Sequence, residues 1–363
     1  MGQNQSVLDP DGDLLVILCN PSSTTGLCED PESSSLGTAA VVGSYSDSDS
    51  DCDIHIDIHK EAELTPPGSE VPSEWHCKVS SKHLALASPY FKAMLNGPWR
   101  KATEIHEDGL RHWEVEDFNP HAMSIVLSII HCKNHLVPQL LGLDMLVEVA
   151  RIVDYLKCYE ATELYGSLWI RSLEDNIPTS YNNELLHWIC IACVFREDKI
   201  FERCTRVAIL ENQQEIPTLG LPVLAQVSDL INQRRMHHLD EIFASVYSLK
   251  DKLTQETKCS FNCDAMRLGY LTKYMHANAL GSCPIRPYTG LSVASVIETF
   301  KSNLPVAIEK KQEVPRSRPR LHCGFKELIA TMITLESEIQ GLDLKHDWAS
   351  SRHTDEIAHK VGG

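Results

Sequence analysis

The fold of this chain is decided by the stretch Trp75-His76-Cys77-Lys78-Val79-Ser80-Ser81-Lys82-His83-Leu84-Ala85-Leu86-Ala87-Ser88-Pro89-Tyr90-Phe91-Lys92-Ala93-Met94-Leu95. Its first part is strand-like and leads into a short helix, which Ser88 and Pro89 end. Ser is a good N-cap, and Pro suits the first helical turn because its missing N–H would have no partner there. Phe91, Met94 and Leu95 then share one face of a second helix. The stretch predicts a helical hairpin packed on a small sheet, without catalytic chemistry.

Segments on both sides extend this pattern. Residues 13–18 predict a first strand, residues 75–79 its partner, and residues 110–115 a third strand. Three helices are predicted to follow. The first has Asn119 as its cap and Pro120 at N1, and the third covers 161–173. The second lies between Gly142 and Cys158, with one face formed by Leu146, Ala150, Val153 and Lys157.

This order of strands and helices resembles the BTB/POZ family, in the form abundant in filamentous fungi. The resemblance covers residues 13–18 and 75–173, and the segments 263–269 and 341–344 look like ones that follow fungal BTB cores. It implies an α+β fold, with a small sheet and αα-hairpins, and a function in protein–protein association. That function would be self-association, scaffolding, or adapting a substrate to a cullin-type ubiquitin ligase. The family's strand-swapped dimer uses an extended N-terminal arm, whereas here only residues 1–12 precede the first strand.

The segment between the first two strands departs from the family, which joins them by a tight turn. Residues 19–74 intervene here, with Ser-rich and Pro-rich clusters and little helical period. Residues 1–74 hold fifteen Asp or Glu and one Lys, a net charge of −14 out of −17, which leaves −3 for the rest of the chain. The insert is therefore expected to be acidic and disordered. Nucleic-acid binding through bulk charge is not expected, because it needs a basic face.

The second half of the chain is predicted to be helical. One helix is expected over 182–195. A second is expected to follow the polar residues 196–199 and to end near residue 210. A later helix has an apolar seam that repeats at alternating three and four residues and consists of Leu239, Ile242, Val246, Leu249 and Leu253. Such a seam needs a partner helix. We expect that partner inside the molecule, because a dimeric coiled coil needs more heptads. A final helix has an apolar face made of Leu328, Met332, Leu335 and Ile339.

Two modifications are suggested by short patterns in the N-terminal region. Gly2, with Ser6 four positions on, satisfies the N-myristoylation pattern, which also arises often by chance. A single acyl chain beside acidic residues would give at most weak membrane association. Four serines each have an acid three residues later, which acidophilic kinases favour, and phosphorylation in this tract is expected; they are Ser44, Ser46, Ser48 and Ser50.

Three patterns imitate metal sites. Asp53, His55, Asp57 and His59 share one face of a predicted strand, but four ligands along one strand span too far to converge. The run 131–135 has two His and a Cys at the end of a helix, where His suits the helix dipole. The best candidate is a zinc site, in which Cys259 and Cys263 at i, i+4 on a helix join His322 and Cys323, with Cys283 as a further ligand. Buried free thiols are the default expectation, so no metal or other cofactor is predicted.

The composition of the chain and the motifs that it lacks limit the possible functions. Thirteen scattered Cys, an odd number, suit a reducing cytoplasm or nucleus rather than a disulfide scaffold. The longest apolar stretch, 185–195, is broken by His187 and is short of the roughly 20 residues of a membrane helix, and no signal peptide is expected. The segment 309–320 is the only basic concentration, a weak candidate for a nuclear import signal. No nucleotide-binding, hydrolase or kinase motif occurs, so an enzyme is not expected.

Together these observations predict an α+β BTB/POZ core followed by an all-helical C-terminal region. The expected organisation is an N-terminal arm 1–12, a BTB/POZ domain 13–173 with the insert 19–74, a helical region 174–255, and a C-terminal helical segment 256–363 with the basic linker 309–320. The expected function is a non-enzymatic interaction module, with itself or a cullin scaffold as partner. The alternatives are a lipid-tethered or zinc-stapled regulatory protein whose C-terminal region binds a ligand, and a hydrolase hidden in the helical half.

Overall fold

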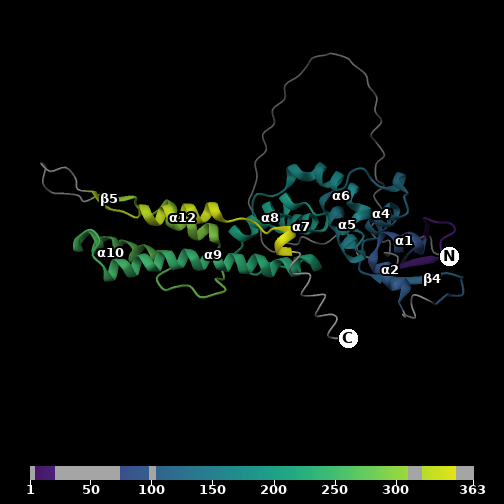
Figure 1. Cartoon of the computed structure of the whole chain (residues 1–363), viewed down its shortest axis with the longest axis horizontal. Helices are drawn as coiled ribbons and strands as arrows, with labels where there is room; N and C mark the ends of the chain where they lie inside the picture. Colours follow the sequence, from purple (N-terminus) through teal and green to yellow (C-terminus); the bar gives the residue numbers. More distant parts are fainter. Residues whose placement is uncertain (1–4, 21–73, 98–103, 310–320, 349–363) are drawn as a thin grey trace, which may run out of the picture.

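A computed structural model describes residues 5–20, 74–97, 104–309 and 321–348 of the chain. The sheet and the first helices lie at one end of an elongated molecule, and the long helix α9 with its neighbours extends to the other end (Figure 1). The part of the insert at 21–73 lies outside the described residues.

The sheet has four strands in the order β1-β3-β2-β4. The central strand β2 (Leu14–Cys19) pairs antiparallel with β3 (Glu74–Val79) and parallel with β4 (Arg111–Glu116). These are the three predicted strands. The additional strand β1 (Gln5–Val7) pairs parallel with β3, so the N-terminal arm contributes to the sheet. The sequence did not predict β1, because three residues are too few to show alternation.

Alternation places one face of the sheet against the helices. Val16 of β2 lies opposite Cys77 of β3 and Trp113 of β4, and all three side chains are buried. On the other face Leu15 lies opposite Lys78 and His112, which are half-buried. The buried face fixes the register, since a slip by one residue would turn every apolar side chain to solvent.

The helical hairpin predicted from the sequence is present as α1 (Ser81–Ala87) and α2 (Pro89–Asn96). The hydroxyl of Ser88 accepts the backbone N–H of Phe91 at 3.1 Å and donates to the carbonyl of Leu156. One side chain therefore caps α2 and joins the hairpin to the end of α5 (Leu143–Leu156). The first turn of α1 is held by Asp13, whose carboxylate accepts the N–H and the hydroxyl of Ser81 at 2.8 and 2.7 Å.

The remaining core helices follow the predicted order. Asn119 caps α4 (Pro120–Ile130) by accepting the N–H groups of His121 and Ala122. Along α5 the predicted apolar positions are buried, whereas Lys157 lies beyond the helix as an exposed cap with φ of 55°. Helix α6 (Tyr159–Leu173) closes the unit.

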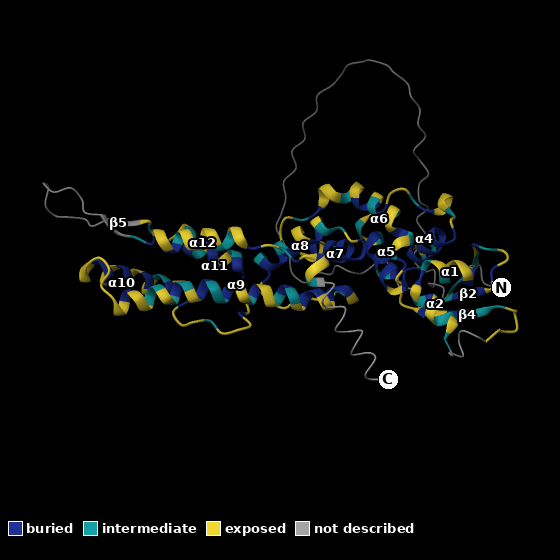
Figure 2. Ribbon diagram, viewed as in Figure 1, coloured by how far each residue is buried: buried dark blue, intermediate teal, exposed yellow. Residues whose placement is uncertain are grey.

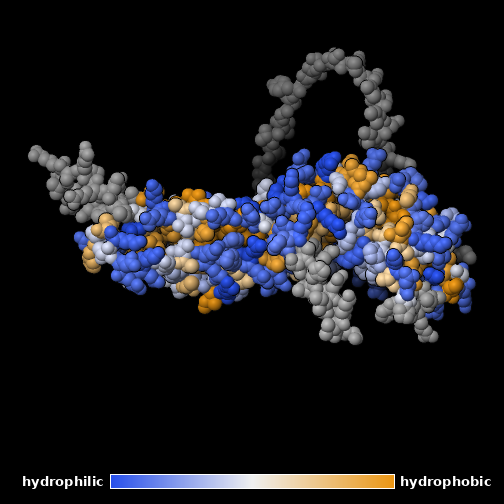
Figure 3. All heavy atoms as spheres, viewed as in Figure 1, coloured by the Kyte–Doolittle hydropathy of each residue, from blue (hydrophilic) through white to orange (hydrophobic). Residues whose placement is uncertain are grey.

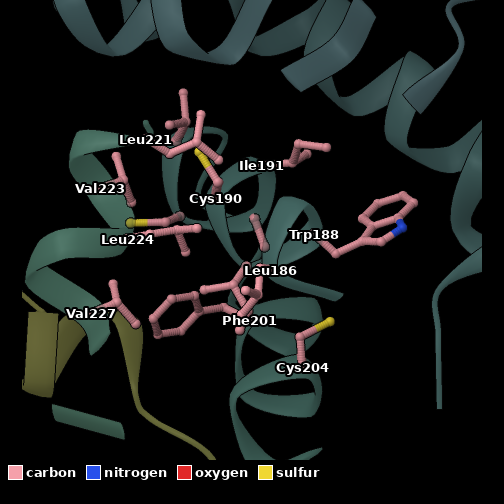
Figure 4. Close-up of a cluster of buried hydrophobic side chains, with 14 of the residues drawn as sticks. Leu186, Trp188, Cys190, Ile191, Phe201, Cys204, Leu221, Val223, Leu224 and Val227 are labelled. Atoms are coloured by element: carbon pink, nitrogen blue, oxygen red, sulfur yellow. The ribbon is translucent and has the colours of Figure 1, made fainter. Parts of the chain in front are cut away.

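Helix α7 (Asn183–Val194) is buried on nearly all sides (Figure 2). It packs against α5, α8 (Asp198–Glu211) and the first turns of α9 (Pro222–Gln255). Leu186 and Cys190 of α7 meet Phe201 of α8 and Leu224 of α9 in one apolar cluster (Figure 4).

The second half of α9 is enclosed by helices of the C-terminal segment, α10 (Phe261–Ala277), α11 (Val293–Ser302) and α12 (Lys326–Glu338). In the predicted seam Leu239, Ile242, Val246 and Leu253 are buried, and Leu249 is partly buried against the same core. The seam therefore packs inside the molecule, as expected. The strands β5 (Ala307–Glu309) and β6 (Leu321–Cys323) form an antiparallel pair that the sequence did not predict.

A strap after α12 returns the chain to α8 and ends in one π-helical turn (Leu344–Trp348). Gly341 lies so close to α8 that a Cβ there would be 1.8 Å from the carbonyl oxygen of Glu202. The next N–H, of Leu342, donates to the hydroxyl of Thr205 at 2.9 Å. Arg206 donates to the carbonyl of Ile339 at 2.9 Å. Only glycine permits this approach.

Replacing Ser88 by Ala removes the cap of α2 and leaves the Leu156 carbonyl without this donor. We expect the free energy of unfolding to fall by about 1–3 kcal/mol. Urea unfolding at neutral pH measures it, with Ser337→Ala as the control because Ser337 is exposed in α12. Equal effects of the two variants would contradict this role of Ser88.

The two substitutions Gly341→Ala and Gly269→Ala are expected to change the stability of the protein in opposite directions. Gly341→Ala should destabilise the protein by about 1–3 kcal/mol because its Cβ has no room. Gly269 is exposed within α10 with no atom within 4 Å of an added Cβ, and Ala there should stabilise by about 0.5–1 kcal/mol. Thermal unfolding of the full chain tests the pair, and a Gly341→Ala variant as stable as wild type would refute the close approach.

Candidate protein-interaction surface

An aromatic cluster lies where α2, β4 and α5 meet. Tyr90 of α2 and Tyr155 of α5 have ring centroids 5.3 Å apart, with their hydroxyl oxygens 3.2 Å apart. Phe118 lies 5.1 Å from the Tyr155 ring. Beneath them the Trp113 ring lies 6.4 Å from Tyr155 and 4.6 Å from Phe91. Because Trp113 and Phe91 are buried, the cluster rests on the core.

Four side chains at this cluster are here called the tyrosine surface: the exposed Tyr155, the half-buried Tyr90 and Arg151, and the buried Phe118. Tyr155 is 37% exposed, and Phe118 is at its edge with 9%. The guanidinium of Arg151 lies 5.4 Å from the Phe118 centroid, pairs with Glu148 at 2.9 Å and donates to the carbonyl of Asp117 at 3.2 Å. The surface thus combines rigid aromatic area with an oriented cation, as the centres of protein interfaces do.

Burial and the contact with Tyr90 raise the pKa of the Tyr155 hydroxyl above its ordinary value. The Tyr155 phenol therefore stays protonated at neutral pH and offers a hydrogen-bond donor and acceptor without charge. Such a surface suits a protein partner with polar backbone or side-chain groups at its centre.

A second group of exposed apolar side chains lies on α6 and in the segment between α4 and α5. The exposed fractions are 68% for Leu164, 49% for Leu168 and 71% for Leu140. The segment is joined to α6 by the indole of Trp169, which donates to the carbonyl of Pro138 at 3.0 Å. Hydrophobic surface is visible over α6 and toward α4 (Figure 3). These leucines have no hydrogen-bonding groups and no fixed cation beside them, so they define a partner less well than the tyrosine surface does.

The suggested modification sites lie outside the described residues. This holds for Gly2, for Ser44, Ser46, Ser48 and Ser50, for the Asp/His run at 53–59, and for most of the basic linker. They stay predictions.

The structure describes the side chains of only part of the predicted zinc set. Helix α10 begins at Phe261, so Cys259 precedes it, and the prediction that Cys259 and Cys263 share a helical face is wrong. Ser260 is the N-cap, accepting the N–H of Cys263, which ends the helix before Cys259. Cys263 itself is buried in the core. The side chains of His322 and Cys323 are not among those described, and within the described residues no three His, Cys, Asp or Glu side chains are arranged to hold a metal.

The run at 131–135 has a structural role centred on His131. This side chain is 6% exposed, its Nδ1 lies 2.8 Å from the carbonyl of Leu127, and its Nε2 accepts the N–H of Ser80 at 3.0 Å. It thereby joins the end of α4 to the start of the hairpin. Burial lowers the pKa of His131, and the neighbouring His83, 5.1 Å away between ring centroids, acts in the same direction, whereas Asp9 opposes it.

Six of the cysteines in the described residues are buried, and for four of them burial clearly changes the pKa of the thiol. Burial raises the pKa of Cys77, Cys158, Cys190 and Cys204 to about 12. These thiols are therefore protonated and unreactive at neutral pH. Their environment offers no activated nucleophile for the hydrolase alternative.

The sequence did not reveal the tyrosine surface. Tyr90 and Tyr155 are 65 residues apart and carry no motif. The available signal was that Tyr90 follows Pro89, the predicted first-turn residue of one helix, and that Tyr155 lies near the end of another predicted helix.

Comparison with protein-family models matches residues 71–173 to the BTB/POZ domain. The match includes β3 and extends through α6, while β1, β2 and everything after α6 lie outside it. The chain thus carries a BTB/POZ domain, a type of module that typically binds other proteins, and no catalytic family was found. Searches of curated proteins and of solved structures gave no match. Within the described residues no helix combines the length and apolar character that crossing a membrane requires.

The protein is expected to lose stability as the pH is lowered, because of His131. Because the pKa of the folded state lies below the unfolded value of about 6.5, the stabilisation is fully present above that pH. It is lost as pH falls toward the folded value, since the unfolded chain takes up the proton first. Urea unfolding at pH 7.5 and 5.5 should show a smaller pH effect in His131→Gln than in wild type. The exposed His121→Gln serves as control, and equal pH effects in all three proteins would contradict the prediction.

Proposed function

We propose that this chain is a non-enzymatic protein-interaction module that binds its partner through the tyrosine surface of the BTB/POZ core. The observation that carries the proposal is the exposed Tyr155, which is fixed by Tyr90 and Phe118 and lies beside Arg151. Holding these side chains in the free protein lowers the entropy cost of binding. Tyrosine and arginine are also the residues that most often dominate binding energy at interfaces.

The finer role follows from the resemblance to the BTB/POZ family. The candidates are self-association, scaffolding, and adapting a substrate to a cullin-type ubiquitin ligase in the cytoplasm or nucleus. Helix α7 follows the core directly and packs on α5, and α8 packs on α7, which supports a binding surface longer than the BTB/POZ domain. The lipid-tethered alternative depends on Gly2 and the zinc-stapled one on His322 and Cys323. Each stays a prediction that intact-mass measurement can test.

Tyr155→Ala is expected to reduce partner binding at least tenfold, since loss of a central interface residue costs about 2 kcal/mol or more. Tyr270→Ala is the matched control, because Tyr270 is 39% exposed but lies on α10, far along the chain from the core. Both variants are expected to keep the wild-type helical signal in circular dichroism.

The measurement is affinity purification of the tagged full-length protein from its native cells, with quantitative mass spectrometry. A cullin scaffold that is lost with Tyr155→Ala and kept with Tyr270→Ala would identify a ligase adaptor. Co-purification of untagged copies under the same pattern would identify self-association. A parallel sample without residues 21–73 shows whether the acidic insert recruits further proteins. Wild-type levels of every interactor in Tyr155→Ala would refute the tyrosine surface.

A further inference from the structure

A pocket of about 540 Å³, with several polar residues in its lining, lies outside the BTB/POZ domain. Three segments form it: the connection between α8 and α9, the first half of α9, and the loop before α11. The lining residues used below are Gln214, Glu215, Asp229, Asn232, Arg235 and Pro287. The size is in the range of known ligand sites.

Arg235 contributes to the inner wall of the pocket and is only 2% exposed. Its guanidinium donates to the carbonyls of Pro287 at 2.8 Å, Tyr288 at 3.3 Å and Leu291 at 2.9 Å. A guanidinium has five N–H donors, so these bonds leave two donors without an acceptor among the described residues, and one of the two is the enclosed Nε. The Nε is enclosed by protein atoms, so the donor left for an acceptor in the pocket is the second N–H of Nη2.

The rim of the pocket carries two carboxylates, Glu215 and Asp229. Both side chains are exposed, and neither forms an ion pair with another described residue. They differ in this from Asp240 nearby on α9, which is paired with Arg286. The rim is therefore complementary to a cationic group.

The walls are held in place without a ligand. The N–H of Gly290 donates to the carbonyl of Gln213 at 2.8 Å, which joins the loop to the connection before α9. The buried Asn212 donates to the side chain of Asn232 at 3.3 Å and accepts the N–H of Gln214 at 3.2 Å. The pocket is thus largely preformed, as binding sites usually are.

We propose that this pocket binds an extended peptide segment that carries Lys or Arg, and that the segment is the basic linker 310–320 of a second copy of the chain. A peptide carbonyl would accept the second N–H of the Arg235 Nη2, while a neighbouring ammonium or guanidinium group would pair with Glu215 and Asp229. The amides of Gln214 and Asn232 can pair with backbone groups of the same segment.

The linker is the occupant because of its charge and its length. It contains Lys310, Lys311, Arg316, Arg318 and Arg320 against one acid, Glu313. Its ends leave β5 and return to β6 at the far tip of the molecule (Figure 1). Arg235 is 20 residues before the end of α9, or about 30 Å along the helix. A closed loop of 11 residues reaches at most about 19 Å, so the linker reaches the pocket of another copy rather than its own.

The first test uses a fluorescein-labelled peptide of residues 309–320 and the full-length protein. Fluorescence anisotropy should show binding that the double variant Glu215→Gln, Asp229→Asn weakens at least tenfold. The matched control is Asp251→Asn, Glu256→Gln, which removes the same charge from exposed positions near the end of α9 and should change Kd less than twofold. No binding, or equal weakening in both double variants, would overturn the site.

A second test separates a second copy from another protein as the source of the segment. Sedimentation velocity of the wild-type protein should show association that rises with concentration. The pocket variant should lose it, as should a variant in which the five Lys and Arg of the linker are Gln. Peptide binding without such association would overturn the assignment to a second copy. The Tyr155→Ala variant keeps this association if the pocket and the tyrosine surface act independently.

Discussion

The enclosure of α7 is the constraint on which the rest of the structure depends. Between Leu185 and Val194 nine of the ten residues are buried, and the tenth, His187, is half-buried. A helix that is apolar all round must be covered on every side. Helix α5 of the BTB/POZ core supplies one side, and α8 and α9 supply the others. The interaction domain and the helical region therefore share one core, and movement between them would open it.

Local signals made much of this fold predictable. Ser88 and Asn119 each cap the helix that the sequence assigned to them, because a cap depends on residues within three positions. The contacts that assemble the elements connect distant residues and could not be predicted in this way. Asp13 holds α1 across 68 residues, and β1 is defined only by the strand it joins.

For the candidate sites, the difference between what local signals predict and what contacts between distant residues decide is larger. The spacing of Cys259 and Cys263 suggested a shared helical face, but Ser260 is the N-cap of α10, so the helix begins after Cys259. Tyr90 with Tyr155, and Arg235 with the carbonyls near Pro287, come from segments more than 50 residues apart. Residue type alone does not mark them, because most tyrosines and arginines in a protein are at ordinary surface positions.

The pairing of β2 with β3 has a consequence for how this domain tolerates change. Cys19 and Glu74 lie directly opposite each other in the ladder, so the chain leaves and re-enters the sheet at adjacent points. Closing a flexible loop across such a gap costs only about 0.6 kcal/mol more for each doubling of its length. The sheet is therefore a permissive site for insertions. Segments of very different length and charge can be exchanged there over evolution, or fused there by design, while the registration of the strands stays the same.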